Sequence, residues 1–188
     1  MNADLALILA LTLTDDHEQV TEYSRQEVID TATDFYSFLT HLHVPDATLL
    51  IAPSTGWPDI TAESHALFHK NDEVLELMRH LPYIERHNHS TAHPVYPLTA
   101  YVDYEGPYVR KKMAFAKRTN QELDLLFIEP DNEDEWIPLD VLCLANETCG
   151  ADGCWFLLDT TDIRAFISLA TPASGRLARH QCRKIHLA

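Results

Sequence analysis

The sequence predicts an α+β protein in which N-terminal helices pack on a mainly antiparallel C-terminal β-sheet. In the front half, up to about residue 84, apolar residues recur at steps of three and four, the period of a helix with one buried face. From about residue 94 onward, short apolar runs rich in aromatic and β-branched residues are bounded by turn or acidic residues, as strands are. Helices followed by strands indicate α+β architecture.

The length of the chain predicts a single domain. A chain of 188 residues can bury a core without the help of a disulfide or a metal. No repeat and no low-complexity linker divides residues 1–188. The last part, residues 176–188, is rich in Arg, Lys and His, and we expect it to be a solvated or partly ordered basic tail.

The clearest predicted helix runs from about Arg25 to Leu42. Ser24 and Glu27 form the S-x-x-E pattern of a capping box just before it, and Pro45 follows its end. Upstream, residues 3–13 are apolar at a spacing that favours a helix weakly over a strand. Downstream, Thr48–Ala52 is short and apolar enough to be a buried strand.

The segment Gly56–Ile84 joins the two halves. Prolines and a glycine predict turns around Trp57, which we interpret as a core anchor beneath a loop, with a ligand platform as the alternative. A short helix is predicted over Thr61–Phe68. A second helix begins at Asn71 or Asp72, buries apolar residues through Leu81, and ends before Pro82.

The back half contains several predicted strands. A β-rich segment covers residues 95–104, and Tyr108–Ala116 is predicted as an edge strand that lysines protect from aggregation. Ile163–Leu169 could be a last strand or a short helix. The other predicted strands are Leu123–Ile128, Val141–Ala145 and Trp155–Leu158.

Charge and cysteine spacing narrow the function classes. The net charge of −15 disfavours nucleic acid and anionic membrane surfaces as partners. The apolar run near the N-terminus is too short to span a bilayer, and Asp4 stands where a signal peptide has positive charge, so we expect a soluble cytoplasmic protein. The four cysteines lack zinc-knuckle spacing and are expected to be reduced, although Cys149 and Cys154 could pair in an exported chain.

Three segments resemble an uncharacterised protein family of filamentous fungi. They are GWPDIT at residues 56–61, NDEVLELMRHLPYI at 71–84 and WFLLDTTD at 155–162. The last segment is also similar to the SUKH superfamily, which includes fungal cell-wall-synthesis regulators and bacterial toxin-immunity proteins. That resemblance implies an α+β sheet with flanking helices and a protein-binding role. The chain departs from the pattern at Ile163–Arg164, where a Gly is expected.

The candidate catalytic residues are His87, His89 and Asp159. In an extended segment His87 and His89 would point to the same face, as two zinc ligands do, and His93 or a carboxylate such as Asp103 could complete a three-ligand site. The plainer interpretation is a solvated histidine-rich loop with no metal. Asp159 ends an apolar strand, where a carboxylate either has a perturbed pKa or caps the next turn.

Two functional hypotheses follow from these patterns. The favoured one is a non-catalytic protein-binding or regulatory module of the SUKH-like type, whose acidic surface binds a protein partner and which needs no cofactor. The alternative is a small enzyme of fungal metabolism with a pocket between helices and sheet. In that case Trp57, Tyr83 and the histidines would line the pocket and bind a small molecule. The sequence leaves open whether the chain is an enzyme.

Overall fold

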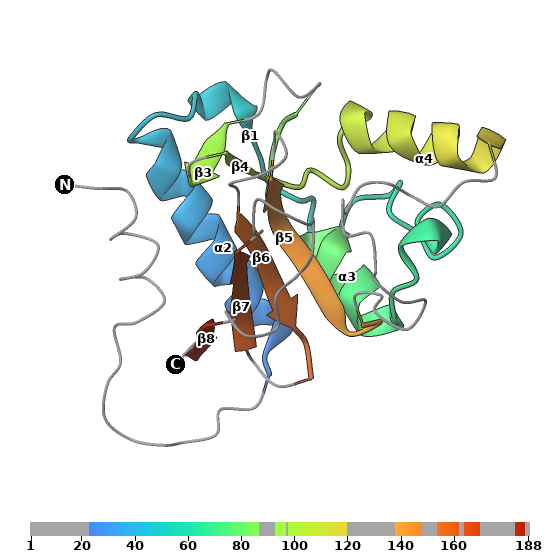
Figure 1. Cartoon of the computed structure of the whole chain (residues 1–188). Coiled ribbons are helices and arrows are strands. Elements are labelled where there is room, and N and C mark those ends of the chain that lie inside the picture. The colour runs from blue at the N-terminus through green and yellow to red at the C-terminus, as the bar shows by residue number, and fades with distance from the viewer. Residues whose placement is uncertain are drawn as a thin grey trace. The chain divides into compact units, whose positions relative to one another are not determined.

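The α+β class is confirmed by a computed structural model of the chain (Figure 1). The residues that it describes are 23–86, 93–96, 98–119, 138–147, 154–161, 164–169 and 183–186. They form two compact units. The helical unit holds the described residues of 25–93 and 101–119, and the sheet unit holds those of 23–24, 94–100 and 138–186. The single domain expected for residues 1–188 stays a prediction. None of the described helices is long and apolar enough to cross a membrane.

Helix α2 spans Arg25–Thr40 and confirms the predicted helix to within two residues at its end. It buries Tyr36 and Leu39, which lie three residues apart on one face. Its last turn unwinds where the N–H of Val44 donates to the carbonyl of Leu39 at 3.1 Å. At its start, Nε of Arg25 lies 2.9 Å from a carboxylate oxygen of Glu73 in the next helix.

Helix α3 spans Asp72–His80, as predicted. Oδ1 of Asn71 accepts a hydrogen bond from the N–H of Val74 at 2.8 Å, which satisfies one of the free donors of the first turn. Val74, Leu77 and Met78 form its buried face, whereas Leu75, also expected to be buried, is half-buried. The helix predicted over 61–68 is instead a turn followed by a short 3-10 helix, η2, at Ala66–Phe68.

A two-stranded antiparallel ladder closes the helical unit. Strand β1, Leu49–Leu50, follows a 3-10 helix, η1, at Asp46–Thr48, and pairs with β2, Tyr83–Ile84. The strand expected at 48–52 is therefore present but only two residues long, and both residues are half-buried rather than buried. The ladder joins the segment before the Trp57 loop to the segment after α3.

Helix α4, Pro107–Thr119, corrects the prediction of an edge strand at Tyr108–Ala116. Pro107 occupies the first helical position, where a missing N–H costs nothing and the fixed φ suits a helix. Val109, Met113 and Ala116 are all buried, at steps of four and three. Lys117, one of the lysines expected to protect an edge strand from aggregation, lies in the last turn of α4, where a positive charge complements the helix dipole.

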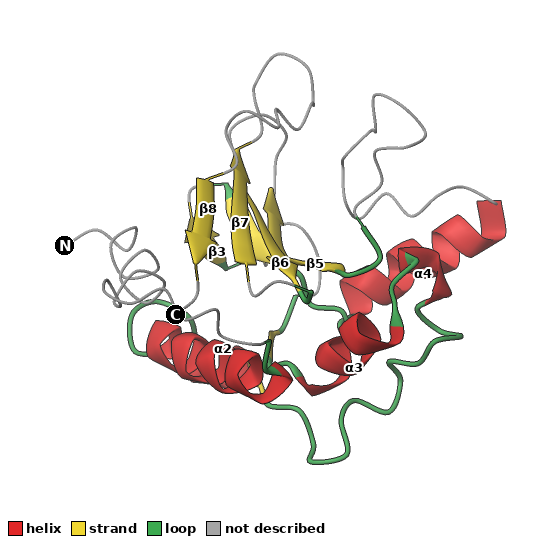
Figure 2. Cartoon of the chain, turned by 90° about the horizontal axis from the view of Figure 1, so that it is seen from below, coloured by secondary structure: helices red, strands yellow, loops and turns green. Residues whose placement is uncertain are grey.

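The sheet has six strands in chain order. Its strands are β3 Pro94–Tyr96, β4 Thr99–Tyr101, β5 Val141–Glu147, β6 Cys154–Asp159, β7 Arg164–Leu169 and β8 Arg183–His186. Figure 2 shows β5, β6, β7 and β8 of this sheet side by side. The pairs β3–β4, β5–β6, β6–β7 and β7–β8 are antiparallel. Residues 163–169, which could have been a strand or a short helix, thus contain strand β7. Part of the basic tail forms β8. The strand predicted at 123–128 lies outside the described residues.

Aromatic rings build much of the core of the helical unit. The ring centroids of Tyr36 and Tyr101 are 4.2 Å apart, and Tyr104 meets both Tyr83 and Phe68 edge-on. All five side chains are buried. Tilted and edge-to-face aromatic pairs of this kind add to the stability gained from burial alone.

Candidate functional site

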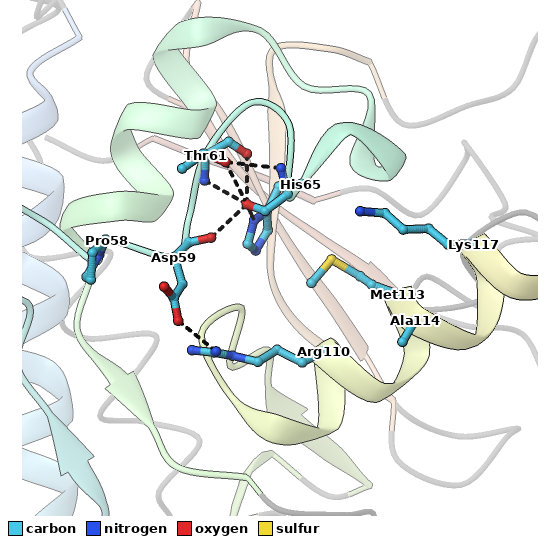
Figure 3. Close-up of a pocket in the computed structure, with 9 residues that line it drawn as sticks. Pro58, Asp59, Thr61, His65, Arg110, Met113, Ala114 and Lys117 are labelled. Carbon is cyan, nitrogen blue, oxygen red and sulfur yellow. Dashed lines mark hydrogen bonds and ion pairs between the residues drawn. The ribbon is translucent and has the colours of Figure 1, made fainter.

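A pocket of about 470 Å³ lies in the helical unit between the loop after Trp57 and helix α4 (Figure 3). A volume of this size falls in the range that small-molecule sites occupy. The loop and the helix contribute its walls. The lining residues are Pro58, Asp59, Thr61, Ser64, His65, Arg110, Met113, Ala114 and Lys117.

The loop wall is one helical turn held by its own side chains. The N–H of Thr61 donates to Oγ of Ser64 at 2.9 Å, and the N–H of Ser64 donates to Oγ1 of Thr61 at 3.0 Å. This reciprocal pair is a capping box with serine in place of the usual acidic or amide residue. The N–H of His65 closes the turn on the carbonyl of Thr61 at 2.9 Å. The wall is therefore fixed before any ligand binds.

His65 lies at the back of this wall with only 3% of its surface exposed. Nε2 is 3.3 Å from the carbonyl of Tyr104, and Nδ1 is 2.8 Å from Oγ of Ser64. Because a carbonyl can only accept, Nε2 carries the proton of the neutral ring. The one proton of the Ser64 hydroxyl has two near acceptors, the carbonyl of Asp59 at 2.7 Å and Nδ1 of His65 at 2.8 Å. Burial lowers the pKa of His65, with smaller lowering by Arg110 and Lys117, while the bond to Tyr104 raises it. The ring is therefore neutral near pH 7.

The contact between Ser64 and His65 does not activate a nucleophile. Oγ of Ser64 already accepts from the N–H of Thr61 and from the Thr61 hydroxyl, both at 2.9 Å. Both of its lone pairs are engaged, and an attacking hydroxyl needs one of them free. Ser64 and His65 thus hold the loop in place.

Arg110 joins the helix wall to the loop. Its Nη1 lies 2.7 Å from a carboxylate oxygen of Asp59, and its Nε donates to the carbonyl of Glu105 at 2.8 Å. Its other terminal nitrogen also pairs with the carboxylate of Glu105. Lys117, seven residues along α4, lines the same pocket and forms no ion pair or hydrogen bond with any residue of the described chain.

A buried carboxylate, Asp103, lies in the aromatic core of the same unit with 1% of its surface exposed. One oxygen accepts from the N–H of Arg86 at 3.1 Å, and the other has no partner among the described residues. A Cβ on Gly106 would clash with the carboxylate of Asp103, so a larger residue there would have to displace that buried side chain. Burial raises the pKa of Asp103 to about 6, against the smaller lowering effect of backbone hydrogen bonds from Arg86 and Gly106.

The outward face of α2 is a second candidate site. Glu27, Asp30 and Asp34 are exposed along the helix, and Phe38 continues the same line with 45% exposure. Leu42, in the turn that follows, is 52% exposed. Steps of three and four place the first four on one side of the helix, and Leu42 follows them four residues after Phe38. We call these five residues the α2 face.

The two residues predicted to bind a ligand serve the packing of the helical unit. Nε1 of Trp57 donates to the carbonyl of Leu81 at 2.9 Å, and its ring centroid is 6.0 Å from that of Tyr83. The Tyr83 hydroxyl donates to the carbonyl of Met78 at 2.5 Å. Neither side chain lines the pocket. Tyr83 is buried, whereas Trp57 is half-buried, so its role as a core anchor stays a prediction.

Of the predicted catalytic residues, Asp159 is described and caps a turn. Its Oδ1 accepts from the N–H and the hydroxyl of Thr161, at 2.8 and 2.7 Å. His87 and His89 lie outside the described residues. His93 is described and half-buried. Within the described part of the chain, no three His, Cys, Asp or Glu side chains group as metal ligands would.

Sequence reasoning did not find the pocket. The T-x-x-S pattern at Thr61–Ser64 was a readable signal for the loop wall, because serine can replace the usual third-position residue of a capping box. The helix wall was missed because 108–116 was predicted as a strand. Burial of His65 had no local signal.

No protein-family model, curated protein or solved structure matches this chain. The likeness to the fungal family and to the SUKH superfamily therefore stays a prediction.

Proposed function

We propose that this chain is a non-catalytic protein-binding module and that its partner docks on the α2 face. The observation that supports this proposal is that the α2 face combines three carboxylates with two large exposed apolar side chains, Phe38 and Leu42. A protein interface typically has an apolar centre surrounded by a polar rim. The α2 face supplies both elements along a single helix.

The charge of the chain favours a basic partner. With a net charge of −15, the field of the molecule accelerates the approach of a positively charged protein. Glu27, Asp30 and Asp34 then provide local complementarity, and Phe38 and Leu42 provide the apolar contact. The occupant we propose is therefore a protein with a basic surface beside an apolar pocket.

The resemblance to the SUKH superfamily supports the same kind of function, because members of that superfamily usually bind other proteins. A regulatory role in the cytoplasm of a fungal cell completes the proposal. It agrees with the acidic composition and with cysteines that lack zinc-knuckle spacing.

The first test uses charge. The full chain captures partners from a fungal cytosolic lysate, each retained protein is purified, and its Kd is measured by calorimetry at several salt concentrations. The doubly reversed variant Asp30→Lys/Asp34→Lys should weaken binding about tenfold or more and reduce the salt dependence. The control, Asp46→Lys/Glu63→Lys, changes the net charge equally at exposed positions outside α2 and should stay within about twofold.

The second test uses the apolar contact. Phe38→Ser should weaken the same complex about thirtyfold, because a central apolar side chain carries much of the binding energy. Ile51→Ser is the matched control, since Ile51 is 55% exposed in the same unit but outside the α2 face. The proposal is wrong if no purified protein binds more weakly to the α2-face variants than to their controls.

A further inference from the structure

Among the residues that the structure describes, Lys117 has no counter-charge, although the chain is strongly acidic. The chain has 29 acidic residues against 14 lysines and arginines, so carboxylates are abundant. Arg110 on the same helix pairs with two of them. Lys117 nevertheless pairs with none of the described residues, and Figure 3 shows its ammonium group reaching toward the loop wall near His65. The charge is thus available to a ligand.

The floor beside Lys117 is apolar. Met113 and Ala114 lie about one turn earlier on α4 and line the pocket there. The carboxylate of Asp59 is held by Arg110 at 2.7 Å, so an anion in the pocket meets a neutralised pair there. One end of the pocket therefore offers a free positive charge, and the space beside it offers apolar contact.

We propose that the pocket between the Thr61–His65 turn and helix α4 binds a small amphipathic carboxylate. Lys117 holds the carboxylate group, and the apolar body of the ligand lies against Met113. This site is separate from the α2 face, and its function does not depend on the protein partner proposed above.

The donor set selects a monoanion. Tight phosphate binding needs several converging donors, as in backbone nests or arginine forks. Here Arg110 is already engaged by Asp59 and Glu105, so Lys117 alone remains. A single ammonium beside an apolar floor suits one carboxylate on a hydrocarbon body. A cationic ligand would be repelled by Lys117.

The probe for the proposal is hexanoate, compared with its neutral analogue hexanamide by calorimetry or by NMR titration of the full chain. Hexanoate should bind at least tenfold more tightly than hexanamide, because a charge-assisted contact is lost in the amide. Butyrate, which lacks two methylenes, should bind about tenfold more weakly than hexanoate. A short peptide ending in leucine with a free carboxylate, against the same peptide amidated, shows whether a protein C-terminus is the source of the carboxylate.

Lys117→Met is the matched variant, because it keeps the length of the side chain and removes the charge. It should weaken hexanoate binding at least tenfold and leave hexanamide unchanged. Lys111→Met is the control, since Lys111 is an exposed lysine of α4 that does not line the pocket. Its hexanoate affinity should equal that of the unaltered chain.

A second readout needs no variant. Lys117 lowers the pKa of His65, as does Arg110, while Asp59 raises it. A carboxylate bound at Lys117 offsets that charge, so saturation with hexanoate should raise the His65 pKa measured by NMR, and hexanamide should not. The proposal is overturned if hexanoate and hexanamide bind equally or not at all, if both lysine variants behave alike, or if the His65 pKa does not move.

Discussion

Replacing Asp103 with asparagine should make the chain more stable at neutral pH and remove a large part of its pH dependence. Asparagine has nearly the shape of a protonated aspartic acid and can still accept the hydrogen bond from the N–H of Arg86, at 3.1 Å in the structure. Its NH₂ group takes the place of an oxygen that has no partner among the described residues. The exchange therefore removes mainly the charge.

The magnitude follows from the pKa of the carboxyl. Burial raises it from 3.8 to about 6 in the folded chain, with further raising by Glu105 and Glu85. The folded state thus binds the proton more tightly than the unfolded state does. The stability from this group is fully present below pH 3.8 and is lost as the pH rises to about 6. The loss amounts to about 3 kcal/mol, since each pKa unit corresponds to about 1.4 kcal/mol.

The assay is urea unfolding followed by tryptophan fluorescence from pH 4 to pH 8. The free energy of unfolding of Asp103→Asn, relative to the unaltered chain, should rise by about 3 kcal/mol across this range and level off above pH 7. Asp34→Asn, an exposed acid of the same unit, is the control and should give a nearly parallel curve. A direct NMR titration of the Asp103 carboxyl should have its midpoint at about 6.

The reasoning fails if the curves of Asp103→Asn and the unaltered chain stay parallel within about 1 kcal/mol between pH 4 and pH 8. That result would mean that the folded chain hydrates Asp103 as well as the unfolded chain does. A midpoint near 4 in the NMR titration would lead to the same conclusion independently of stability.

Two further predictions concern the caps and anchors of the helical unit, both measured by urea unfolding. Trp57→Phe removes the N–H that donates to the carbonyl of Leu81 and should cost about 1–2 kcal/mol, while Trp57→Ala should cost about 3–5 kcal/mol. Near-normal stability of Trp57→Ala with altered ligand binding would instead restore a binding role to this residue. Asn71→Ala removes the acceptor for the N–H of Val74 and should cost about 1 kcal/mol, against a few tenths for the neighbouring Asp72→Ala. Equal losses in the last two variants would contradict the capping role.

Helices α2 and α3 could be predicted from the sequence because their signals are local. Asn71 caps α3 through a residue three positions away, and Pro82 ends it almost at once. The extent of α2 follows from the helical period of its apolar residues, but its buried face does not. Phe38 and Leu42 continue that period and yet are 45% and 52% exposed, whereas Tyr36 is buried. Strands β5 and β6 were found for the same reason, since each is a short continuous apolar run bounded by turn residues.

The environment of Asp103 had no such signal. It follows Val102 in a segment rich in β-formers, where alternation tells which residues share a face but not how well a carboxylate is hydrated. Its position depends on distant parts of the chain. Burial raises the pKa of Tyr36, 67 positions earlier, and the negative charge of Asp103 raises it further. Asp103 lies against Gly106, and that contact is visible only in the folded chain.

The pocket could not be predicted from the sequence because one of its walls, helix α4, was predicted as a strand. Arg110 and Lys117 are seven residues apart. The predicted edge strand ended at Ala116, one residue before Lys117. Continued to Lys117 it would have placed the two charges on opposite sides of a sheet, because residues separated by an odd number of positions on a strand point to opposite faces. On a helix, seven residues make nearly two full turns, which places both on one side, as the pocket lining shows. The period of residues 107–119 therefore decides not only the fold of the segment but whether a site exists there at all.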